Sequence, residues 1–550
     1  MSLLTLLFRI VHARKYKALA DIPGPKPQFP LGNLLDLISG EPLWRVLARY
    51  AIEYGPISVM WIGSKPSVVL NDPDAIAHVL LDKDELPHAE GSSETQTSHP
   101  SDKGAVSRCP VHRFLPTSQA DFYKNLPRKA LLPMLTDNSP FIARDAGKTW
   151  TRLSDKDPFN QPYFEDWLSS QVHPLQEFLE TRAAELVGQS EVEMLPTYET
   201  LQKMTFDGFS LAVDGRIFPS EVYEEFCLMC DAGTQRMSLS TTLGNWAIPT
   251  EPRSKRYRQA SQKWYALFDR VVQDTRAASP TQSLLQWMKE YSSDDFTEQQ
   301  LRDYCAGIYP GGAVSVPSAI VNALHLLWQH PDQMMVLQQA LDDLMVAPLT
   351  YDRLNNCLPL EQVMRETLRL FPAVPFFTRN VRPDKSIQLG DYEIPANTQL
   401  FINNWFLHRH SSHWDTPEAF KPERWDRATI EANPFGSRYY FPFGRGKRAC
   451  IGQTFAQYTI KLTLAVLLAK LDVQFGDEPN QQEYHFAVAV PRKVRATFSY
   501  RPPTDGGCHL THRFTQESLT QESHPQTLES PLSPSDVSEP VATQATKQAN

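Results

Sequence analysis

The chain has 550 residues, of which 41% are hydrophobic, so it is long enough to bury a large core. Its 54 basic residues against 63 acidic ones give a formal net charge of −9, which argues against a general nucleic-acid binder. Seven cysteines, an odd number, are scattered without a disulfide framework. This pattern suits a reducing compartment.

The N-terminal segment, residues 1–21, is short, apolar and basic. Residues 2–12 are too short to span a bilayer and include Arg9, and a basic cluster follows at 14–17. Such a segment suits an amphipathic anchor at a membrane surface, and no secretory cleavage pattern is present. We expect a cytoplasmic protein, soluble or peripherally associated with the cytosolic face of a membrane.

The next part of the chain combines an extended segment, strands and a polar insertion. Residues 22–27 (Ile-Pro-Gly-Pro-Lys-Pro) are rigid and extended. Residues 57–70 predict a hairpin of two β-strands, and Asp72 opens a capped helix. Residues 88–113 are polar with few hydrophobic side chains, which predicts a disordered insertion.

From about residue 160 to 300 the pattern is helical, with a polar stretch from Pro249 that separates two helical runs. Within it, Cys227 and Cys230 form a CxxC without a second pair, which we interpret as packing thiols and not as a zinc site. Residues 503–550 are rich in Ser, Thr, Gln, Glu and Pro and predict a disordered tail.

The most specific motif runs from Phe443 to Gly452 (Phe-Gly-Arg-Gly-Lys-Arg-Ala-Cys-Ile-Gly). Gly446 and Gly452 permit a tight loop with its backbone close to a flat cofactor, and Arg448 can reach a haem propionate. A helical sequence follows Cys450, so its sulfur lies at a helix N-terminus, where the dipole favours a thiolate. The alternative is an ordinary buried thiol in a glycine loop.

This run meets every fixed position of FxxGxRxCxG, the haem-ligand signature of the cytochrome P-450 superfamily, which the chain resembles over about residues 22–502. The resemblance implies a mainly α-helical fold with small β-sheets, in a single large haem domain over 22–502, flanked by 1–21 and the tail 503–550. It implies haem as cofactor and Cys450 as axial thiolate and metal ligand. An axial thiolate favours O–O cleavage.

Other residues match the family by motif. Glu366, Arg369 and Arg424 correspond to a buried Glu/Arg/Arg network that holds the loop before the cysteine. Arg379 and Trp150 correspond to residues that contact haem propionates. The resemblance thus implies a structural network beside the cofactor-binding residues.

Residues 304–328 resemble the helix that crosses the distal face of the haem, where relatives carry an acid and a threonine for proton delivery. Here the acid is Val314 and the threonine is Ser315, so half of the relay is missing and Ser315 is the catalytic candidate. Pro317 has no N–H, which frees the carbonyl of Ala313 to hold a water near the oxygen site. The alternative is a merely kinked, packed helix.

The leading hypothesis is a monooxygenase that inserts one atom of O2 into a hydrophobic small molecule. Nothing in the chain resembles a flavin, nicotinamide or iron–sulfur module, so we expect an external ferredoxin or flavoprotein reductase that docks around Arg445 and Lys447. Two alternatives stay open. Val314 motivates a peroxide-using or rearranging enzyme, an isomerase or dehydratase, and the cysteine loop equally suits a non-catalytic haem-binding sensor or carrier.

Overall fold

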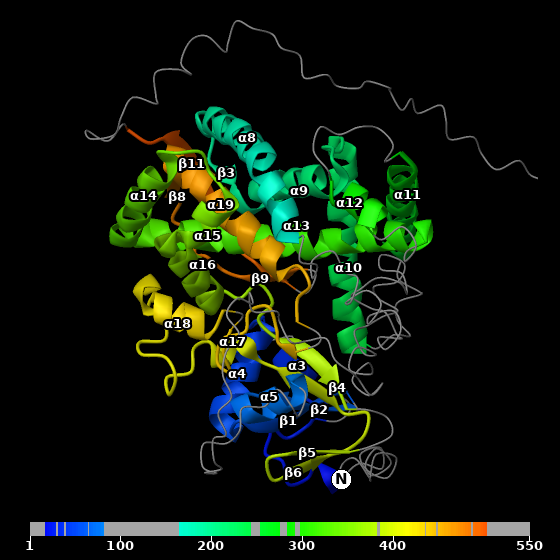
Figure 1. Ribbon diagram of the computed structural model, residues 1–550. Helices are drawn as coiled ribbons and strands as arrows, with labels where there is room; N and C mark the ends of the chain where they lie inside the picture. The colour runs from blue at the N-terminus through cyan, green and yellow to red at the C-terminus, as the bar shows by residue number, and fades with distance from the viewer. Residues whose placement is uncertain are drawn as a thin grey trace, which may run out of the picture. The chain divides into compact units, whose positions relative to one another are not determined.

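One long helix, α13 (Glu298–Gln329), crosses the helical part of the protein in the computed structural model (Figure 1). Contacts divide the chain after Arg501, and the helices and strands described here lie in the first unit. The predicted insertion and tail lie outside the described residues. The described residues are 17–28, 31–37, 40–63, 65–81, 164–243, 253–274, 283–291, 297–381, 386–434, 436–446, 449–485 and 488–502.

Helices account for most of the described residues, which confirms the expected mainly α fold. Besides α13, they are α3 (Leu34–Leu37), α4 (Leu43–Tyr54), α5 (Pro73–Leu80), α8 (Phe164–Ser190), α9 (Thr197–Asp214), α10 (Ser220–Leu243), α11 (Arg253–Asp274), α12 (Leu284–Tyr291), α14 (Pro331–Met345), α15 (Tyr351–Asn356), α16 (Leu358–Leu370), α17 (Asn404–Leu407), the 3-10 helix η6 (Pro422–Arg424), α18 (Arg427–Ala432) and α19 (Gln453–Lys470).

The strands form small sheets with the orders β1-β2-β7-β4, β3-β11-β8, β10-β9 and β5-β6. Their bounds are β1 (Ile57–Ile62), β2 (Lys65–Leu70), β3 (Leu195–Pro196), β4 (Phe377–Asn380), β5 (Ile387–Leu389), β6 (Tyr392–Ile394), β7 (Gln399–Ile402), β8 (Leu471–Phe475), β9 (Glu483–His485), β10 (Val488–Val490) and β11 (Arg495–Tyr500).

The largest sheet joins two parts of the chain that are far apart in sequence. β1 and β2 pair antiparallel, which confirms the predicted hairpin, and β2 then pairs in parallel with β7. Because side chains alternate along a strand, Val68 and Leu70 enter one apolar core and Val69 enters another. Asp72 then caps α5, since its Oδ1 accepts the N–H of Ala75 at 2.7 Å.

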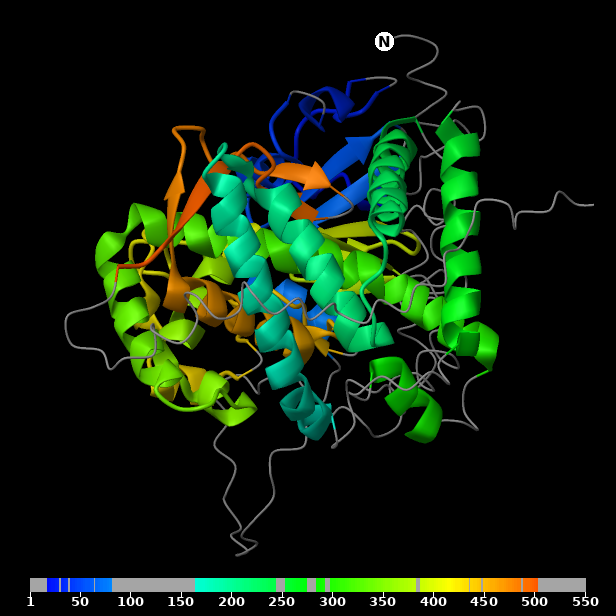
Figure 2. The same ribbon diagram turned by 90° about the horizontal axis from the view of Figure 1, so that it is seen from above.

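α13 begins at a capping box, in which the Thr297 hydroxyl accepts the N–H of Gln300 and the Gln300 side chain accepts the N–H of Thr297. Most of the helix is buried, and it packs against α9, α11 and α19. In Figure 2 the green α13 runs behind teal helices, of which α9 packs against it. It is long and apolar enough to cross a membrane, but 78% of its most apolar window is buried inside the protein. We therefore interpret it as a core helix.

Candidate active site

The cysteine loop makes two turns in left-handed backbone, at Gly444 (φ 72°) and Gly446 (φ 69°). Its closing hydrogen bond joins the Cys450 N–H to the carbonyl of Phe443 at 2.8 Å, and α19 begins three residues after Cys450. Cys450 is exposed, whereas Cys230, which the CxxC placed among the packing thiols, is buried. The loop therefore presents one sulfur outward from a backbone that is itself closed.

The two glycines of the motif serve different purposes. A Cβ on Gly446 would lie 2.0 Å from the carbonyl oxygen of Leu80, so the loop packs on the backbone at the end of α5. A Cβ on Gly452 would meet no atom within 4 Å. Gly446 is thus required by a contact inside the protein, which the sequence did not predict, while the space beside Gly452 is open to a flat group.

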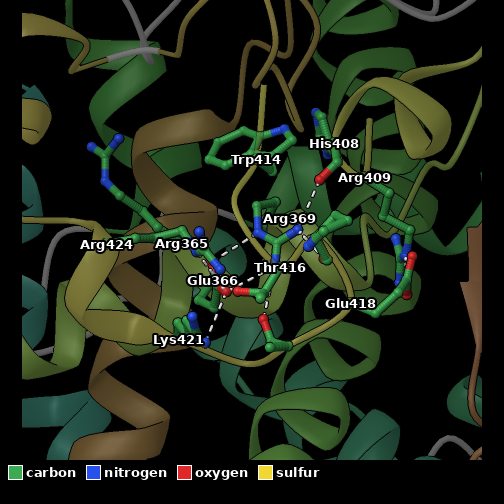
Figure 3. A network of polar contacts seen from close by, with 12 residues as sticks. Arg365, Glu366, Arg369, His408, Arg409, Trp414, Thr416, Glu418, Lys421 and Arg424 are labelled. Carbon is green, nitrogen blue, oxygen red and sulfur yellow. Dashed lines mark hydrogen bonds and ion pairs between the residues drawn. The ribbon is translucent and has the colours of Figure 1, made fainter. Parts of the chain in front are cut away.

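The predicted network is assembled around one carboxylate, that of Glu366 on α16 (Figure 3). Arg369 binds it in a bidentate manner at 2.8 and 2.9 Å, and Nε of Arg424 donates to it at 3.0 Å. The Trp425 indole and the Lys421 backbone N–H each add a bond of 2.9 Å. Glu366 and Arg369 are both fully buried. Trp425 was missed, although it directly follows Arg424 in the sequence.

Arg369 extends the network into the segment that leads to the cysteine loop. Its Nη atoms donate to the carbonyls of His408, Pro417 and Ala419 at 2.9, 2.6 and 3.0 Å. One side chain therefore satisfies three backbone acceptors that no regular helix or strand would satisfy. Its guanidinium also lies 5.2 Å from the ring centroid of Trp414 (Figure 3).

His408 carries the connection onward. Its Nε2 accepts the backbone N–H of Phe441 at 3.0 Å, two residues before Phe443. Burial, together with the charges of Arg369 and Arg409, lowers the pKa of His408 to about 3, so the imidazole is neutral and able to accept. A continuous series of hydrogen bonds thus runs from Glu366 to the base of the cysteine loop.

A second buried ionic cluster supports the same region and was not predicted. Glu361 on α16 binds Arg365 at 2.6 Å and Lys461 of α19 at 3.1 Å. Burial alone would raise the pKa of Glu361, but Lys461 and Arg365 hold it below its usual value. The Tyr440 hydroxyl donates to the Arg365 carbonyl at 3.1 Å. This cluster ties α16 to the helix that follows the cysteine and to the segment that precedes it.

Arg379 lies on β4 and is 5% exposed. Its Nη1 donates to the Thr378 carbonyl at 3.0 Å, and its guanidinium lies 5.0 Å from the ring centroid of Phe377. A guanidinium of this kind is suited to binding a carboxylate. The other predicted propionate contacts, Trp150 and Arg448, lie outside the described residues.

On α13, the helix predicted to cross the distal face, Val314 is fully buried in the apolar core. The Ser315 hydroxyl donates to the carbonyl of Gly311, one turn earlier, at 2.5 Å, which leaves its oxygen able to accept a further hydrogen bond. Tyr198 of α9 donates to the Val314 carbonyl at 3.2 Å, a contact between helices that sequence reasoning missed.

Two prolines interrupt the hydrogen bonding of α13 without ending the helix. Pro310 removes the N–H that the Ala306 carbonyl would accept, and Nε1 of Trp264 donates to that carbonyl instead, at 3.3 Å. Pro317 removes the corresponding donor for Ala313. A carbonyl freed by proline in this helix is therefore accessible to a donor from outside it.

The residues fit a haem. In the part of the chain that the structure describes, no group of three or more His, Cys, Asp or Glu side chains is placed to hold a bare metal ion. A porphyrin supplies the remaining ligands itself, so one outward thiol at Cys450 is sufficient. The open space beside Gly452 and the buried cation of Arg379 suit a flat ring that carries carboxylates.

Comparison with known proteins identifies the class of oxidoreductases to which this site belongs. The sequence profile described as Cytochrome P450 matches residues 22–113 and 247–497. The chain therefore belongs to the cytochrome P-450 family, whose members in general carry haem on a cysteine thiolate and use O2, redox partners and small-molecule substrates. It is a cytochrome P-450 monooxygenase.

The relatives are diverse. Cytochrome P450 71D10 of Glycine max is 22% identical, over 86% of this chain and 86% of its own length. The mitochondrial 1,25-dihydroxyvitamin D(3) 24-hydroxylase of Rattus norvegicus is 24% identical, over 88% and 89% of the two chains. The steroid 17-alpha-hydroxylase/17,20 lyase of Mesocricetus auratus is 31% identical, over 34% and 37%.

Proposed function

We propose that this enzyme inserts one atom of O2 into a hydrophobic small molecule at a haem whose axial ligand is Cys450, with electrons from a separate ferredoxin or flavoprotein reductase. The observation that carries the proposal is the exposed Cys450 on a loop held by two buried ionic clusters. When bound, haem with an axial thiolate supplies oxygen activation and O–O cleavage.

The chain's own residues hold and orient the cofactor. The first turn of α19 favours a thiolate at Cys450, because the positive end of the helix dipole faces it. Gly452 leaves room for the ring, and Arg379, with Arg448 and Trp150, binds the propionates. Phe443, Gly446 and the Glu366 network keep the loop in position.

On the distal side, Ser315 holds a proton at its Oγ and accepts a hydrogen bond from a water that the Ala313 carbonyl anchors. Val314 offers no acid at the neighbouring position, so this route carries the protons that relatives pass through a carboxylate. The same observation favours the second candidate, a peroxide-using or rearranging enzyme, because such a reaction needs no protons from the chain.

The redox partner docks on the basic surface that includes Arg445, with Lys447 outside the described residues. Opposite charge on a partner would steer the encounter. The basic N-terminal segment supports our proposal that the enzyme lies in the cytoplasm or on the cytosolic face of a membrane.

Purified, haem-loaded protein distinguishes these functions. Substrate consumption is compared, over a panel of hydrophobic compounds, with reductase and NAD(P)H or with peroxide alone. Turnover that requires reductase supports the monooxygenase with external electrons. Turnover with peroxide alone, or with neither addition, supports the second candidate. Absence of turnover under every condition supports the non-catalytic haem-binding protein instead.

A further inference from the structure

The Tyr198 hydroxyl is a polar contact on the distal helix from outside it. Tyr198 lies on α9, is fully buried and donates to the Val314 carbonyl at 3.2 Å. Burial, with smaller effects from Cys230 and other neighbours, raises the pKa of Tyr198 well above its usual value. The hydroxyl therefore keeps its proton and acts as a donor to the helix backbone.

Tyr198 binds the peptide unit that joins Val314 to Ser315. The carbonyl of Val314 and the N–H of Ser315 belong to one planar group, so a bond that orients the first also orients the second. The backbone of Ser315 in turn sets where its Oγ lies. Tyr198 thus acts on the proposed proton donor through a single rigid peptide.

The same turn of α13 is tied to other elements by side chains. Pro317 removes one internal hydrogen bond, that of Ala313, and the Ser318 hydroxyl donates to the Ala489 carbonyl of β10 at 2.6 Å. External bonds from α9 and to β10 thus add to the hydrogen bonds that the helix supplies to itself. Such a turn depends on its neighbours for its geometry.

The carbonyls freed by the two prolines of α13 differ in the donors that lie near them. At Pro310 the freed carbonyl of Ala306 receives the Trp264 indole directly. At Pro317 the outside donor, Tyr198, binds the adjacent carbonyl, and none of the described side chains donates to Ala313. The proposed relay assigns its water to the Ala313 carbonyl.

We propose that Tyr198 is a positioning residue for proton delivery, which holds the Val314–Ser315 peptide so that Ser315 and the Ala313 carbonyl share one water. This inference rests on the proposed function. Val314 has no polar side chain, so the hydroxyl of Tyr198 on α9 is the group that supplies a polar contact at this position of α13.

The test compares Tyr198→Phe with Tyr223→Phe in the haem-loaded enzyme. Both variants lose one hydroxyl and keep the ring, but the Tyr223 hydroxyl contacts the Glu199 carbonyl and the Gln202 side chain, not α13. Tyr198→Phe should lower product formed per NAD(P)H roughly tenfold, less than the factor on the order of 10²–10⁴ that proton transfer itself supplies, because the variant misplaces the relay and does not remove it. Peroxide release should rise in proportion, and substrate affinity should stay unchanged.

A readout independent of turnover is amide hydrogen exchange over residues 313–318, which should accelerate in Tyr198→Phe and not in Tyr223→Phe. In the double variant with Ser315→Ala, the yield should equal that of Ser315→Ala alone, because both changes affect one step. Equal exchange and yield in the two tyrosine variants, or additive losses in the double variant, overturn the inference. Failure of the proposed relay itself shows separately, as an unchanged yield in Ser315→Ala.

Discussion

The two sides of the candidate site are held by different kinds of interaction, buried charges on the cysteine side and apolar packing with neutral hydrogen bonds around α13. On the cysteine side, the buried Arg369 of α16 donates to backbone carbonyls, and the neutral imidazole of His408 accepts the N–H of Phe441 before the loop. On the other side, which we propose to be the distal one, α13 lies mainly among buried apolar side chains, and the neutral hydroxyls of Tyr198 and Ser318 join its turn around Ser315 to α9 and β10. Buried charges thus support the cysteine loop, whereas apolar contacts and neutral hydrogen bonds hold α13.

The difference predicts different consequences of mutation. Removing one partner of a buried ion pair leaves a charge without compensation and typically costs about 3–5 kcal/mol. Removing a neutral hydrogen bond typically costs about 0.5–1.5 kcal/mol. Changes on the cysteine side should therefore affect the fold and haem retention, whereas changes on the distal side should affect the reaction.

The largest expected effect is that of Cys450→Ser. A serine hydroxyl does not replace a thiolate on haem iron, so the strongly red-shifted Soret band of the reduced carbon monoxide complex should disappear completely. An absorption difference spectrum measures this. Persistence of the band would refute Cys450 as the ligand.

Glu366→Ala should abolish haem retention, because Arg369 and Arg424 would become buried cations without their carboxylate, at a cost of roughly 3–5 kcal/mol. The matched control is Glu185→Ala, which removes the acid of an i,i+3 pair with Arg182 on α8 whose side chain is 46% exposed. The control should retain haem, since exposed pairs contribute about 0–1 kcal/mol. Haem content per protein after purification is the measurement, and equal retention in both variants would contradict the ionic support.

Ser315→Ala tests the distal side. It should lower reductase-driven product yield by a factor on the order of 10²–10⁴, while haem content and substrate binding stay nearly intact. Peroxide-driven turnover should suffer less, since peroxide brings its own protons. An unchanged yield with reductase would show that the relay does not pass through this hydroxyl.

The smallest effect concerns pH. His408 has a pKa of about 3 in the folded protein against an ordinary value of 6.5. Between these pH values the unfolded chain binds a proton that the folded chain does not, so the contribution of His408 to stability is complete above pH 6.5 and is lost as the pH falls towards 3. His408→Asn, which keeps an acceptor for the Phe441 N–H, should flatten the fall of Tm with pH. Identical slopes in both proteins would exclude this role.

Sequence motifs predicted the parts of the site whose residues have fixed spacing along the chain. Glu366 and Arg369 lie one helical turn apart, and the structure brings Arg424 to them. Trp425 was accessible to the same reasoning, because a buried indole beside a buried acid needs an acceptor.

The missed contacts join residues that are distant in sequence. Tyr198 reaches Val314 and Lys461 reaches Glu361 only because helices cross in the folded protein, and no local period encodes such crossings. The different purposes of Gly446 and Gly452 likewise depend on what packs against each. Periodicity reports which face of a helix is apolar, not which neighbour that face meets.

The packing of Gly446 on the Leu80 carbonyl has a consequence for how the enzyme is made. α5 leaves the ribosome early, and the loop that must rest on it is synthesised near the end of the haem domain. Because synthesis proceeds from the N-terminus, α5 is complete well before the cysteine loop that packs on it. The cysteine loop reaches its final shape only when the two have met, so haem capture belongs to the last stage of maturation.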